Sequence, residues 1–281
     1  MARRPHVLVY DSGLGGLSVA RALHRLGGGH VCLSYLADTG GFPYGDWPEI
    51  TLRKRILALM HQVMQTVRPD VVVIACNTAT VTALAPLRST FDVPFVGTVP
   101  AIKPAAHATK SGIIGVLATP STVRREYTEM LIHTYAYHHR VVLHGAPHLA
   151  RLAERRLSGE PVAPEDIAAE IAPAFLCEGD GRRTDVLVLG CTHYPLIRED
   201  IEAAAPWPVT IIDPSPAIAR RALEVAATCH REMTETCKDH GPDRPAGWVT
   251  DAAGQDRLGP ILVREGFSPV GVLDLPERDR P

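Results

Sequence analysis

The chain has 281 residues, of which 46% are hydrophobic and 5% aromatic, and its formal net charge at pH 7 is −2. The near-neutral charge and the lack of a Lys/Arg tract argue against a nucleic-acid-binding surface, no stretch reaches the ~18 apolar residues of a membrane span, and the apolar run after the basic residues 1–5 is too short for a signal peptide. We therefore expect a cytoplasmic protein without a nucleic-acid or membrane partner, long enough for two domains of about 100–150 residues.

Eight apolar runs along the chain are typical of strands, and they alternate with helical patterns. They are Val7–Tyr10, Val31–Leu36, Val71–Ala75, Val93–Gly97, Ile113–Leu117, Val141–Leu143, Val186–Gly190 and Val209–Ile212. This alternation is typical of parallel sheets with helices on both faces. We predict an α/β fold of two pseudo-symmetric α/β lobes with mainly parallel sheets and an active site at the lobe interface.

Helices are predicted between these runs by apolar period and by capping chemistry. A helix is expected over Leu17–Leu26, and Pro164 followed by two acidic residues indicates the first turn of another. Apolar residues recur with helical spacing at Val123, Tyr127, Met130 and Leu131, and again at Ile218, Ala222, Val225 and Ala226. We expect each of these helices to bury one face.

Clusters of proline mark two crossings between the lobes, near residues 94–104 and near residues 206–208. The first lobe is therefore predicted to be discontinuous, with residues 1–98 plus 208–275. The second lobe takes residues 99–207. Residues 276–281 are expected to form a frayed tail.

Two cysteine tripeptides follow corresponding strands in the two halves of the chain. Cys76-Asn77-Thr78 ends the run Val71–Ala75, and Cys191-Thr192-His193 ends the run Val186–Gly190. Such runs read as strands buried on both faces, and in parallel sheets ligands bind at the carboxyl ends of strands. Six cysteines are too sparse and irregular for a disulfide framework. The remaining four are interpreted as small core residues: Cys32, Cys177, Cys229 and Cys237.

A pair of thiols suits a reaction whose product is the mirror image of its substrate. If a pseudo-twofold axis relates the lobes, the two cysteines flank one bound molecule. Such a reaction removes a proton from one face of a carbon atom and returns a proton to the other face, which a single base does not readily reach. Cysteine suits both roles because its ordinary pKa of ~8.5 makes thiol and thiolate accessible near neutral pH.

Four motifs, taken together and in this order, resemble glutamate racemases of the aspartate/glutamate racemase superfamily. They are Val9–Ser18, Phe42–Gly45, Ile74–Ala79 and Leu189–Leu196. The resemblance implies a racemase that interconverts L- and D-glutamate without a cofactor or metal and supplies D-glutamate for peptidoglycan and the cell wall. It also implies two α/β lobes with the site between them.

The resemblance carries over to individual residues. Cys76 and Cys191 match the two acid/base thiols. Asp11 matches a side chain that assists Cys76, and His193 with Glu154 matches the pair that assists Cys191. The positions that match substrate-binding residues are Asp11, Ser12, Tyr44, Gly45, Asn77, Thr78, Thr119, Thr122, Thr192 and His193.

The substrate carboxylates are expected to meet backbone N–H groups at helix starts, with Tyr44 closing over the side-chain carboxylate. The segment Val99–Ala105 resembles the subgroup of the family that a peptidoglycan nucleotide precursor activates. The resemblance also leaves a homodimer open.

Other interpretations of the same residues stay open at this point. Aspartate racemase is the nearest rival, because pocket size alone separates the two substrates. Gly13–Ser18, with Asp38 ending the next strand, imitates a nicotinamide-dinucleotide fingerprint. Cys191 with His193 would also suit a thiol hydrolase, and a module that binds an amino acid without converting it is the non-enzymatic alternative. Glu154, beside several arginines, would equally suit a surface ion pair.

Overall fold

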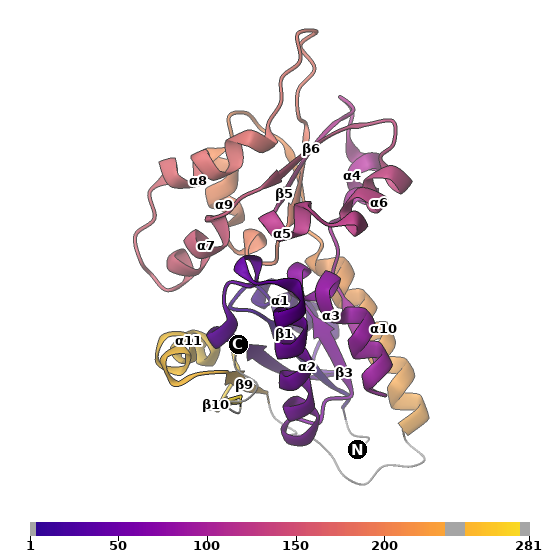
Figure 1. The fold of residues 1–281 in the computed structure, drawn as a ribbon, viewed down its shortest axis with the longest axis vertical. Coiled ribbons are helices and arrows are strands. Elements are labelled where there is room, and N and C mark those ends of the chain that lie inside the picture. Colours follow the sequence, from indigo (N-terminus) through magenta and orange to yellow (C-terminus); the bar gives the residue numbers. More distant parts are fainter. Residues whose placement is uncertain (1–3, 234–244, 276–281) are drawn as a thin grey trace. The chain divides into compact units, whose positions relative to one another are not determined.

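The computed structural model describes residues 4–233 and 245–275, and the chain separates into two compact units. Unit 1 is Met1–Thr98 with Ser215–Pro281, and unit 2 is Val99–Pro214. Each unit is an α/β layer structure around its own sheet (Figure 1). The tail predicted for residues 276–281 and the core role predicted for Cys237 lie outside the described residues.

Unit 1 is built on a six-stranded parallel sheet in the order β10-β9-β2-β1-β3-β4. Its strands are β1 (His6–Asp11), β2 (Cys32–Ala37), β3 (Val71–Ile74), β4 (Phe95–Gly97), β9 (Ala246–Val249) and β10 (Val270–Val272). In β1, Tyr10 is level with Leu36 of β2 and Ile74 of β3. The carboxyl ends of these three central strands therefore lie side by side.

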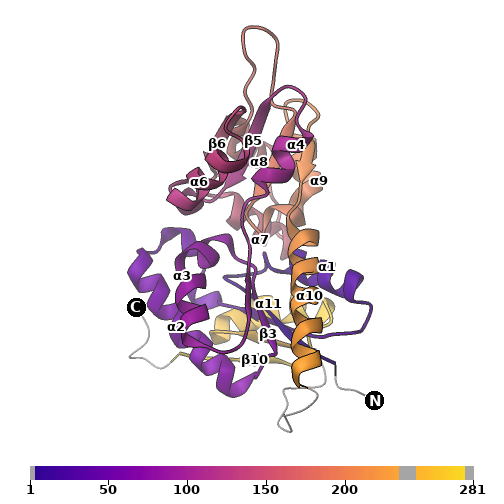
Figure 2. The same cartoon turned by 90° about the vertical axis from the view of Figure 1, so that its right-hand side faces the viewer.

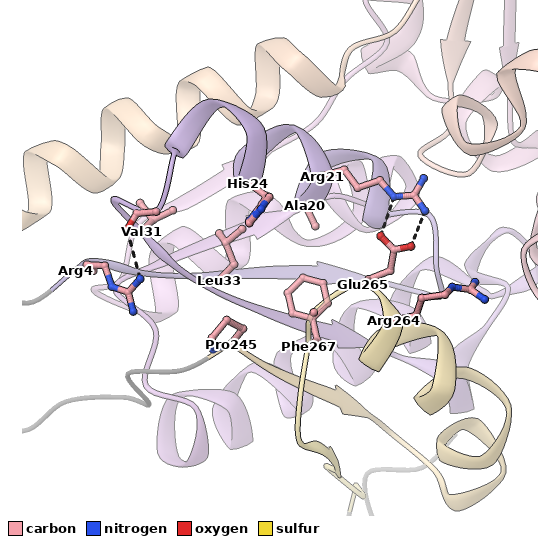
Figure 3. A pocket seen from close by; sticks show the side chains of 12 residues that line it. Arg4, Ala20, Arg21, His24, Val31, Leu33, Pro245, Arg264, Glu265 and Phe267 are labelled. Atoms are coloured by element: carbon pink, nitrogen blue, oxygen red, sulfur yellow. Dashed lines mark hydrogen bonds and ion pairs between the residues drawn. The ribbon is translucent and has the colours of Figure 1, made fainter.

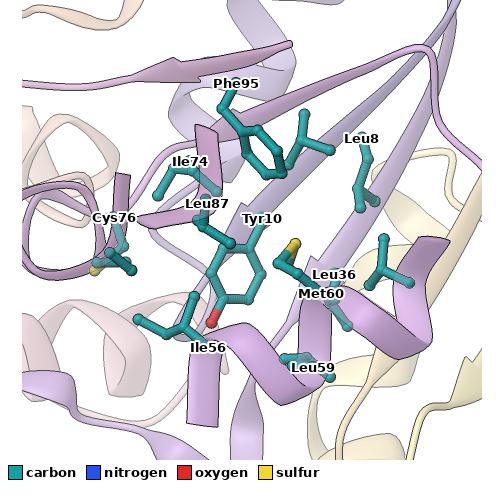
Figure 4. Close-up of a cluster of buried hydrophobic side chains, with 14 of the residues drawn as sticks. Leu8, Tyr10, Leu36, Ile56, Leu59, Met60, Ile74, Cys76, Leu87 and Phe95 are labelled. Carbon is teal, nitrogen blue, oxygen red and sulfur yellow. The ribbon is translucent and has the colours of Figure 1, made fainter. Parts of the chain in front are cut away.

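Helices cover both faces of this sheet. They are α1 (Leu17–Gly27), α2 (Glu49–Thr66), α3 (Asn77–Thr90), α10 (Ser215–Met233) and α11 (Ala252–Arg264), with short turns η1 (Thr39–Gly41) and η2 (Tyr44–Asp46). Leu8 and Tyr10 of β1 point towards α2 and α3, where they join Ile56 in a buried cluster (Figure 4). Side chains alternate along a strand, so the fully buried Val7 and Val9 face the other side. On the unit's other helices, α1 packs along α10 and α10 contacts β1, β3 and β4 (Figure 2).

Unit 2 repeats the design with four parallel strands in the order β6-β5-β7-β8. The strands are β5 (Ile113–Ala118), β6 (Arg140–Gly145), β7 (Val186–Gly190) and β8 (Thr210–Ile212). One core cluster joins the sheet to α7 (Leu149–Leu157), α8 (Pro164–Ile171) and α9 (Arg198–Ala204), and another joins it to α4 (Ile102–Ala108) and α6 (Glu126–Tyr135). The short elements are α5 (Pro120–Val123), η3 (Ala172–Ala174) and η4 (Tyr194–Ile197).

The α/β fold with mainly parallel sheets is confirmed, and a strand lies in each of the eight predicted runs. The helix predicted to begin at Pro164 does so as α8. The two strands that the sequence did not predict, β9 and β10, have four and three residues, and each contains a glycine that weakens the strand pattern. None of the helices within the described ranges combines the length and apolar character needed to cross a bilayer.

The chain returns to unit 1 later than the predicted residue 208. Strand β8 (Thr210–Ile212) pairs with β7, and Val186 is level with Thr210. Unit 2 therefore extends to Pro214. The prolines at 206 and 208 precede an edge strand of the second sheet and do not mark the crossing.

Two sequence predictions about burial are wrong. Val123 ends α5 and a new helix begins at Glu126, so the predicted apolar face is interrupted and Tyr127 and Met130 are exposed. Cys177 is also exposed, because it belongs to a hairpin in which it bridges Arg183. No disulfide joins the five cysteines that the structure describes.

Candidate functional site

In unit 1, the predicted residues gather at the carboxyl ends of β1 and β3. Tyr10 pairs with Ile74, and the Ala75 N–H donates to the Tyr10 carbonyl at 2.8 Å, so the chain segments that carry Ser12 and Cys76 leave neighbouring strands at the same edge. The Ser12 hydroxyl donates to the Cys76 sulfur at 3.8 Å. We call Asp11, Ser12, Cys76, Asn77 and Thr78 the Cys76 cluster.

Cys76 combines burial with a position that favours negative charge. The residue is 7% exposed and serves as the N-cap of α3, whose first two residues, Asn77 and Thr78, are also buried. The positive end of a helix dipole stabilises an anion, either a thiolate or a substrate carboxylate. Asp11 is fully buried at the end of β1, and its Oδ1 accepts a hydrogen bond from the Gly13 N–H at 2.9 Å.

Tyr44 lies in the same unit, but its hydroxyl points into the protein. The residue is 2% exposed, and its hydroxyl donates to the Asp38 carboxylate and contacts the Tyr10 hydroxyl. In this arrangement the hydroxyl does not cover a substrate carboxylate as the sequence suggested. A ligand at this turn would therefore contact the main-chain groups of Tyr44 and of the half-buried Gly45, and not the Tyr44 hydroxyl.

In unit 2, Cys191 is the first residue after β7 and begins a chain of side chains. Its sulfur lies 3.7 Å from His193 Nδ1, and His193 Nε2 lies 3.1 Å from Glu154 Oε1. A carboxylate only accepts hydrogen bonds, so in a neutral imidazole Nε2 carries the proton and Nδ1 is left as an acceptor for the Cys191 thiol. Glu154, from α7, is 7% exposed, which excludes the interpretation as a solvated surface ion pair.

Two threonines follow β5, the strand next to β7: Thr119 is the first residue after it, and Thr122 lies in the short helix α5. Because Ala118 of β5 is level with Gly190 of β7, Thr119 and Cys191 follow side by side. Thr119 caps α5, and its hydroxyl lies 2.9 Å from that of the fully buried Thr122. We call Thr119, Thr122, Glu154, Cys191, Thr192 and His193 the Cys191 cluster.

Gly190 fixes how closely the Cys191 cluster approaches the neighbouring strand. A Cβ atom on Gly190 would lie 2.8 Å from the Leu117 carbonyl oxygen, which is closer than real Cβ contacts allow. Glycine is therefore required at the position before Cys191.

The sequence reasoning missed several buried polar residues near these clusters. In unit 1 they are Tyr10, Arg55 and Thr250, and Asp38 was considered only as part of a dinucleotide pattern. In unit 2, the Tyr194 hydroxyl donates to the Ala118 carbonyl at 3.2 Å, and burial, followed by the charge of Cys191, raises the pKa of this phenol well above its usual range. Asp38 had a usable signal, since it ends a strand at the same edge as Asp11.

The dinucleotide interpretation does not survive the geometry of the first turn. In a dinucleotide site the N–H groups of the glycine-rich turn point at pyrophosphate. Here the Gly13 N–H is bonded to the Asp11 carboxylate, whose negative charge lies where a pyrophosphate would need positive potential. Within the described parts of the chain, no three His, Cys, Asp or Glu side chains are grouped so as to hold a metal ion.

A separate pocket of about 350 Å³ opens in unit 1 between α1 and the end of α11 (Figure 3). Arg4, Arg21, His24 and Arg264 surround it, and Arg21 is paired with Glu265 at 2.7 Å. None of the predicted site residues lines this pocket. The chemistry of the two cysteine clusters therefore does not take place there.

Comparison with known proteins matches the motifs and the fold. The family model of Asp/Glu/Hydantoin racemases matches residues 18–222. A glutamate racemase of Agrobacterium fabrum is 52% identical over 217 residues, which cover 77% of this chain and 79% of that protein. One of Brucella anthropi is 49% identical over 225 residues, 80% of each chain.

Solved structures agree. The glutamate racemase of Escherichia coli, in complex with L-glutamate and the activator UDP-MurNAc-Ala, superposes with a TM-score of 0.87 at 36% identity, covering 97% of this chain and 99% of that one. These relatives are named for glutamate, which favours the first interpretation over aspartate racemase, a thiol hydrolase or a non-catalytic binding module. The chain belongs to the Asp/Glu/Hydantoin racemase family and, within it, to the glutamate racemases.

Proposed function

We propose that the chain racemises glutamate with two bases, Cys76 and Cys191, one on each face of the substrate α-carbon. The observation that carries this proposal is the duplication of the thiol. In unit 1 a polar cluster follows the central strands β1 and β3, and in unit 2 a polar cluster follows the central strands β5 and β7. Each cluster contains one buried cysteine, and the two cysteines have the same topological position. Inversion needs a base on one face and an acid on the other, and two interchangeable thiols supply both in either direction.

In the step at Cys191, His193 Nδ1 accepts the thiol proton and the thiolate removes the α-proton of the substrate. In the opposite direction the Cys191 thiol donates its proton to the α-carbon, and the His193 imidazolium returns a proton to the sulfur. Glu154 supports this step because its carboxylate holds the Nε2–H of His193 and stabilises the imidazolium that forms. Glu154 is a positioning residue, since it acts through the imidazole.

In the step at Cys76, the thiolate is stabilised by the Ser12 hydroxyl and by the N-terminal end of α3. Asp11, at the end of the neighbouring strand, is assigned the role of proton acceptor or ammonium partner. Its burial favours the protonated form of a carboxylate, which suits a proton acceptor, and the positive α-ammonium group of the substrate suits an ionised carboxylate as its partner.

The two substrate carboxylates are assigned to different groups. Main-chain N–H groups at Asn77 and Thr78, where α3 begins, suit one carboxylate. The turn of Tyr44 and Gly45, the hydroxyls of Thr119 and Thr122, and Thr192 complete the proposed binding residues.

Deuterium incorporation in ²H₂O tests the two-base mechanism. With wild-type protein and L-glutamate, the D-glutamate formed early is expected to carry an α-deuterium while the remaining L-glutamate keeps its α-hydrogen, because each thiol returns solvent hydrogen to one face only. A single shared base would deuterate both pools together, and that result would overturn the proposal.

Cys76→Ala and Cys191→Ala are the matched variants, with Cys32→Ala as a control at a buried thiol outside both clusters. Each of the first two is expected to lower racemisation by at least about 10²–10⁴-fold. Any residual exchange is expected for L-glutamate in one variant and for D-glutamate in the other. Equal exchange of both enantiomers in both variants would contradict the assignment of one face to each cysteine.

A peptidoglycan precursor is proposed as an activator. The support is the complex of the Escherichia coli relative with UDP-MurNAc-Ala and the Val99–Ala105 segment in which α4 begins. Adding UDP-MurNAc-Ala to the purified protein is expected to raise kcat/KM, with UDP-N-acetylglucosamine as the control. An unchanged kcat/KM at saturating nucleotide would refute this role.

Homodimerisation and a cytoplasmic location stay predictions. The sedimentation coefficient of the purified chain as a function of concentration tests the first. Fractionation of the source cells tests the second.

A further inference from the structure

A fully buried carboxylate, Asp38, lies beside the Cys76 cluster and has no role in the proposed chemistry. It is the first residue after β2, and its N–H donates to the Asp11 carbonyl at 2.9 Å. Because Ala37 is level with Asp11, Asp38 lies at the same strand edge as Ser12. The carboxylate is thus at the edge of the sheet where the substrate is proposed to bind.

Three elements supply hydrogen bonds to Asp38. Arg55 of α2 donates from Nε to Oδ2 at 2.7 Å and from Nη2 to Oδ1 at 2.5 Å. The Thr250 hydroxyl, at the end of β9, donates to Oδ1 at 2.6 Å, and the Tyr44 hydroxyl donates to Oδ2. Both carboxylate oxygens are therefore engaged by groups that are distant in the sequence.

The hydroxyl chain has one direction. Because Tyr44 donates to Asp38, the contact between the two phenols leaves Tyr10 as the donor and the Tyr44 oxygen as the acceptor. Burial, then the charge of Asp38, raises the pKa of both tyrosines well above the usual range, so both hydroxyls keep their protons at neutral pH. The order Tyr10 to Tyr44 to Asp38 is therefore fixed in the working range of pH.

The surroundings of Asp38 allow very little movement of the turn that follows it. A Cβ on Gly41 would lie 2.6 Å from Asp38 Oδ2, 2.7 Å from Arg55 Nε and 2.8 Å from the Tyr44 ring. The Gly40 N–H donates to the Thr250 hydroxyl at 2.9 Å, and the Thr250 N–H donates to Thr39 at 3.2 Å. Residues 38–44 are thus fixed by close packing around Gly41 and by hydrogen bonds to Thr250.

A buried ion pair is a poor way to gain stability, because desolvating the two charges offsets most of their attraction. What such a pair does provide is directionality, since a bidentate guanidinium fixes the plane and the rotation of the carboxylate. An apolar core would fill the same space without fixing the orientation of the 44–45 turn.

We propose that Asp38 is a positioning residue for glutamate binding: with Arg55 and Thr250 it holds the Tyr44 hydroxyl inward, and so presents the Tyr44–Gly45 main chain to the substrate. The inference rests on the proposed function, in which this turn belongs to the residues that bind glutamate. Tyr44 acts through its backbone, and Tyr10, which is remote from the turn in sequence, supports it through the hydroxyl chain.

The test uses variants that remove one hydroxyl and keep the shape of the side chain. Tyr10→Phe, Tyr44→Phe and Thr250→Val are each expected to raise KM for glutamate about 3–10-fold with kcat nearly unchanged, because a binding contact is lost equally in the ground and transition states. Tyr137→Phe and Thr90→Val, both at exposed residues, are the matched controls and should leave KM at the wild-type value.

The double variant Tyr10→Phe/Tyr44→Phe separates positioning from direct contact. If both residues act through one chain, its KM is expected to equal that of Tyr44→Phe alone, which is non-additive behaviour. If the Tyr44 hydroxyl contacted the substrate, Tyr44→Phe alone would raise KM while Tyr10→Phe would not, and that pattern would overturn the proposal. A fall in Tm with KM unchanged would assign the network a purely structural role and would also overturn it.

Failure of this inference is distinguishable from failure of the proposed function. An unchanged KM in the hydroxyl variants, together with inactive Cys76→Ala and Cys191→Ala variants, would remove only the positioning role of Asp38. Active cysteine variants would remove the two-base mechanism whatever the KM values are.

Discussion

The two cysteine clusters share one backbone frame but differ in the groups that handle the proton. In unit 1 the strand order around the cluster is β2-β1-β3-β4, and in unit 2 it is β6-β5-β7-β8. Cys76 follows β3 and Cys191 follows β7, so the two thiols are topologically equivalent. Cys191 has an imidazole at 3.7 Å, whereas Cys76 has a serine hydroxyl at 3.8 Å and the start of a fourteen-residue helix.

The repeated strand order therefore accounts for the equivalent positions of the two thiols. It does not account for how each thiol is ionised, because their neighbouring side chains differ. His193 can store the proton of Cys191, because its Nδ1 is an acceptor while Glu154 holds Nε2. Ser12 donates to sulfur and therefore stabilises a thiolate that has already lost its proton. The steps at the two faces of glutamate should consequently respond to different mutations.

The largest expected effects come from removing the proposed proton acceptors, with His193→Asn for Cys191 and Asp11→Asn for Cys76. Each is expected to lower kcat about 10²–10⁴-fold. Since the enantiomers have equal energy, each variant must lower kcat/KM equally in both directions. The comparison therefore needs a measurement that reports on one step at a time.

Deuterium isotope effects with α-deuterated L- and D-glutamate provide that measurement. In His193→Asn the step at Cys191 becomes limiting, so the larger isotope effect is expected for the enantiomer that Cys191 deprotonates. In Asp11→Asn the preference should be reversed. The same preference in both variants would show that the two acceptors are not divided between the two thiols.

A smaller effect is expected for Glu154→Gln, which keeps the shape of the side chain but removes its charge. The amide oxygen of Gln still accepts the Nε2–H, so the loss is the difference between a charged and a neutral hydrogen bond, about 1–1.5 kcal/mol, which corresponds to a decrease of about 5–13-fold in kcat. Glu160→Gln is the control, because Glu160 forms an exposed ion pair with Arg155 at 3.2 Å. A kcat equal to that of the control would leave Glu154 without a part in the step at Cys191.

The sequence predicted the frame well because buried parallel strands have a strong signature. Runs such as Val71–Ala75 and Val186–Gly190 contain only apolar residues and glycine, and the polar tripeptides that follow them mark the strand ends. The short strand β10 (Val270–Val272) has a glycine at its centre, which weakens this signal. Tyr127 was misassigned because a helix break changes the face without changing the composition.

The side-chain networks were harder to predict, since they join residues that are distant in the chain. Glu154 and His193 are 39 residues apart, and Asp38 and Thr250 are 212 apart. A motif shows which residue types are present but not which way a hydroxyl points. The inward orientation of Tyr44 is set by Asp38 and Arg55, and no local pattern around Tyr44 contains that information.

Thr122→Val tests the substrate-binding side of the Cys191 cluster with a more modest effect. The change removes one hydroxyl of the Thr119–Thr122 pair and keeps the volume, so a loss of about 0.5–1.5 kcal/mol should raise KM about 2–12-fold. Thr134→Val is the control, since Thr134 is exposed and its hydroxyl donates to the Met130 carbonyl of its own helix. An equal KM in both variants would remove Thr122 from the binding site.

The smallest expected effect is on the stability of unit 2 and comes from the Asp185 carboxylate, which has no counterpart in the proposed chemistry. Asp185 of unit 2 accepts hydrogen bonds from the Thr109 hydroxyl at 2.6 Å and from the Lys110 and Ser111 N–H groups at 2.7 and 2.9 Å. Burial raises the pKa of this carboxyl, but the hydrogen bonds outweigh burial and lower it below its usual value. A lowered folded-state pKa gives stability that is fully present above the unfolded value of ~3.9 and is lost as pH falls through the folded value.

Asp185→Asn is therefore expected to destabilise unit 2 at pH 7 and to have no effect at a pH below both values. Because the carboxyl is partly exposed, solvent screening limits the loss to about 1 kcal/mol, or about 2–4 °C in Tm by calorimetry. Asp92→Asn, at an exposed aspartate of unit 1, is the control. A decrease in Tm that persists unchanged at low pH would show that packing, and not the ionised carboxylate, is what Asp185 contributes to unit 2.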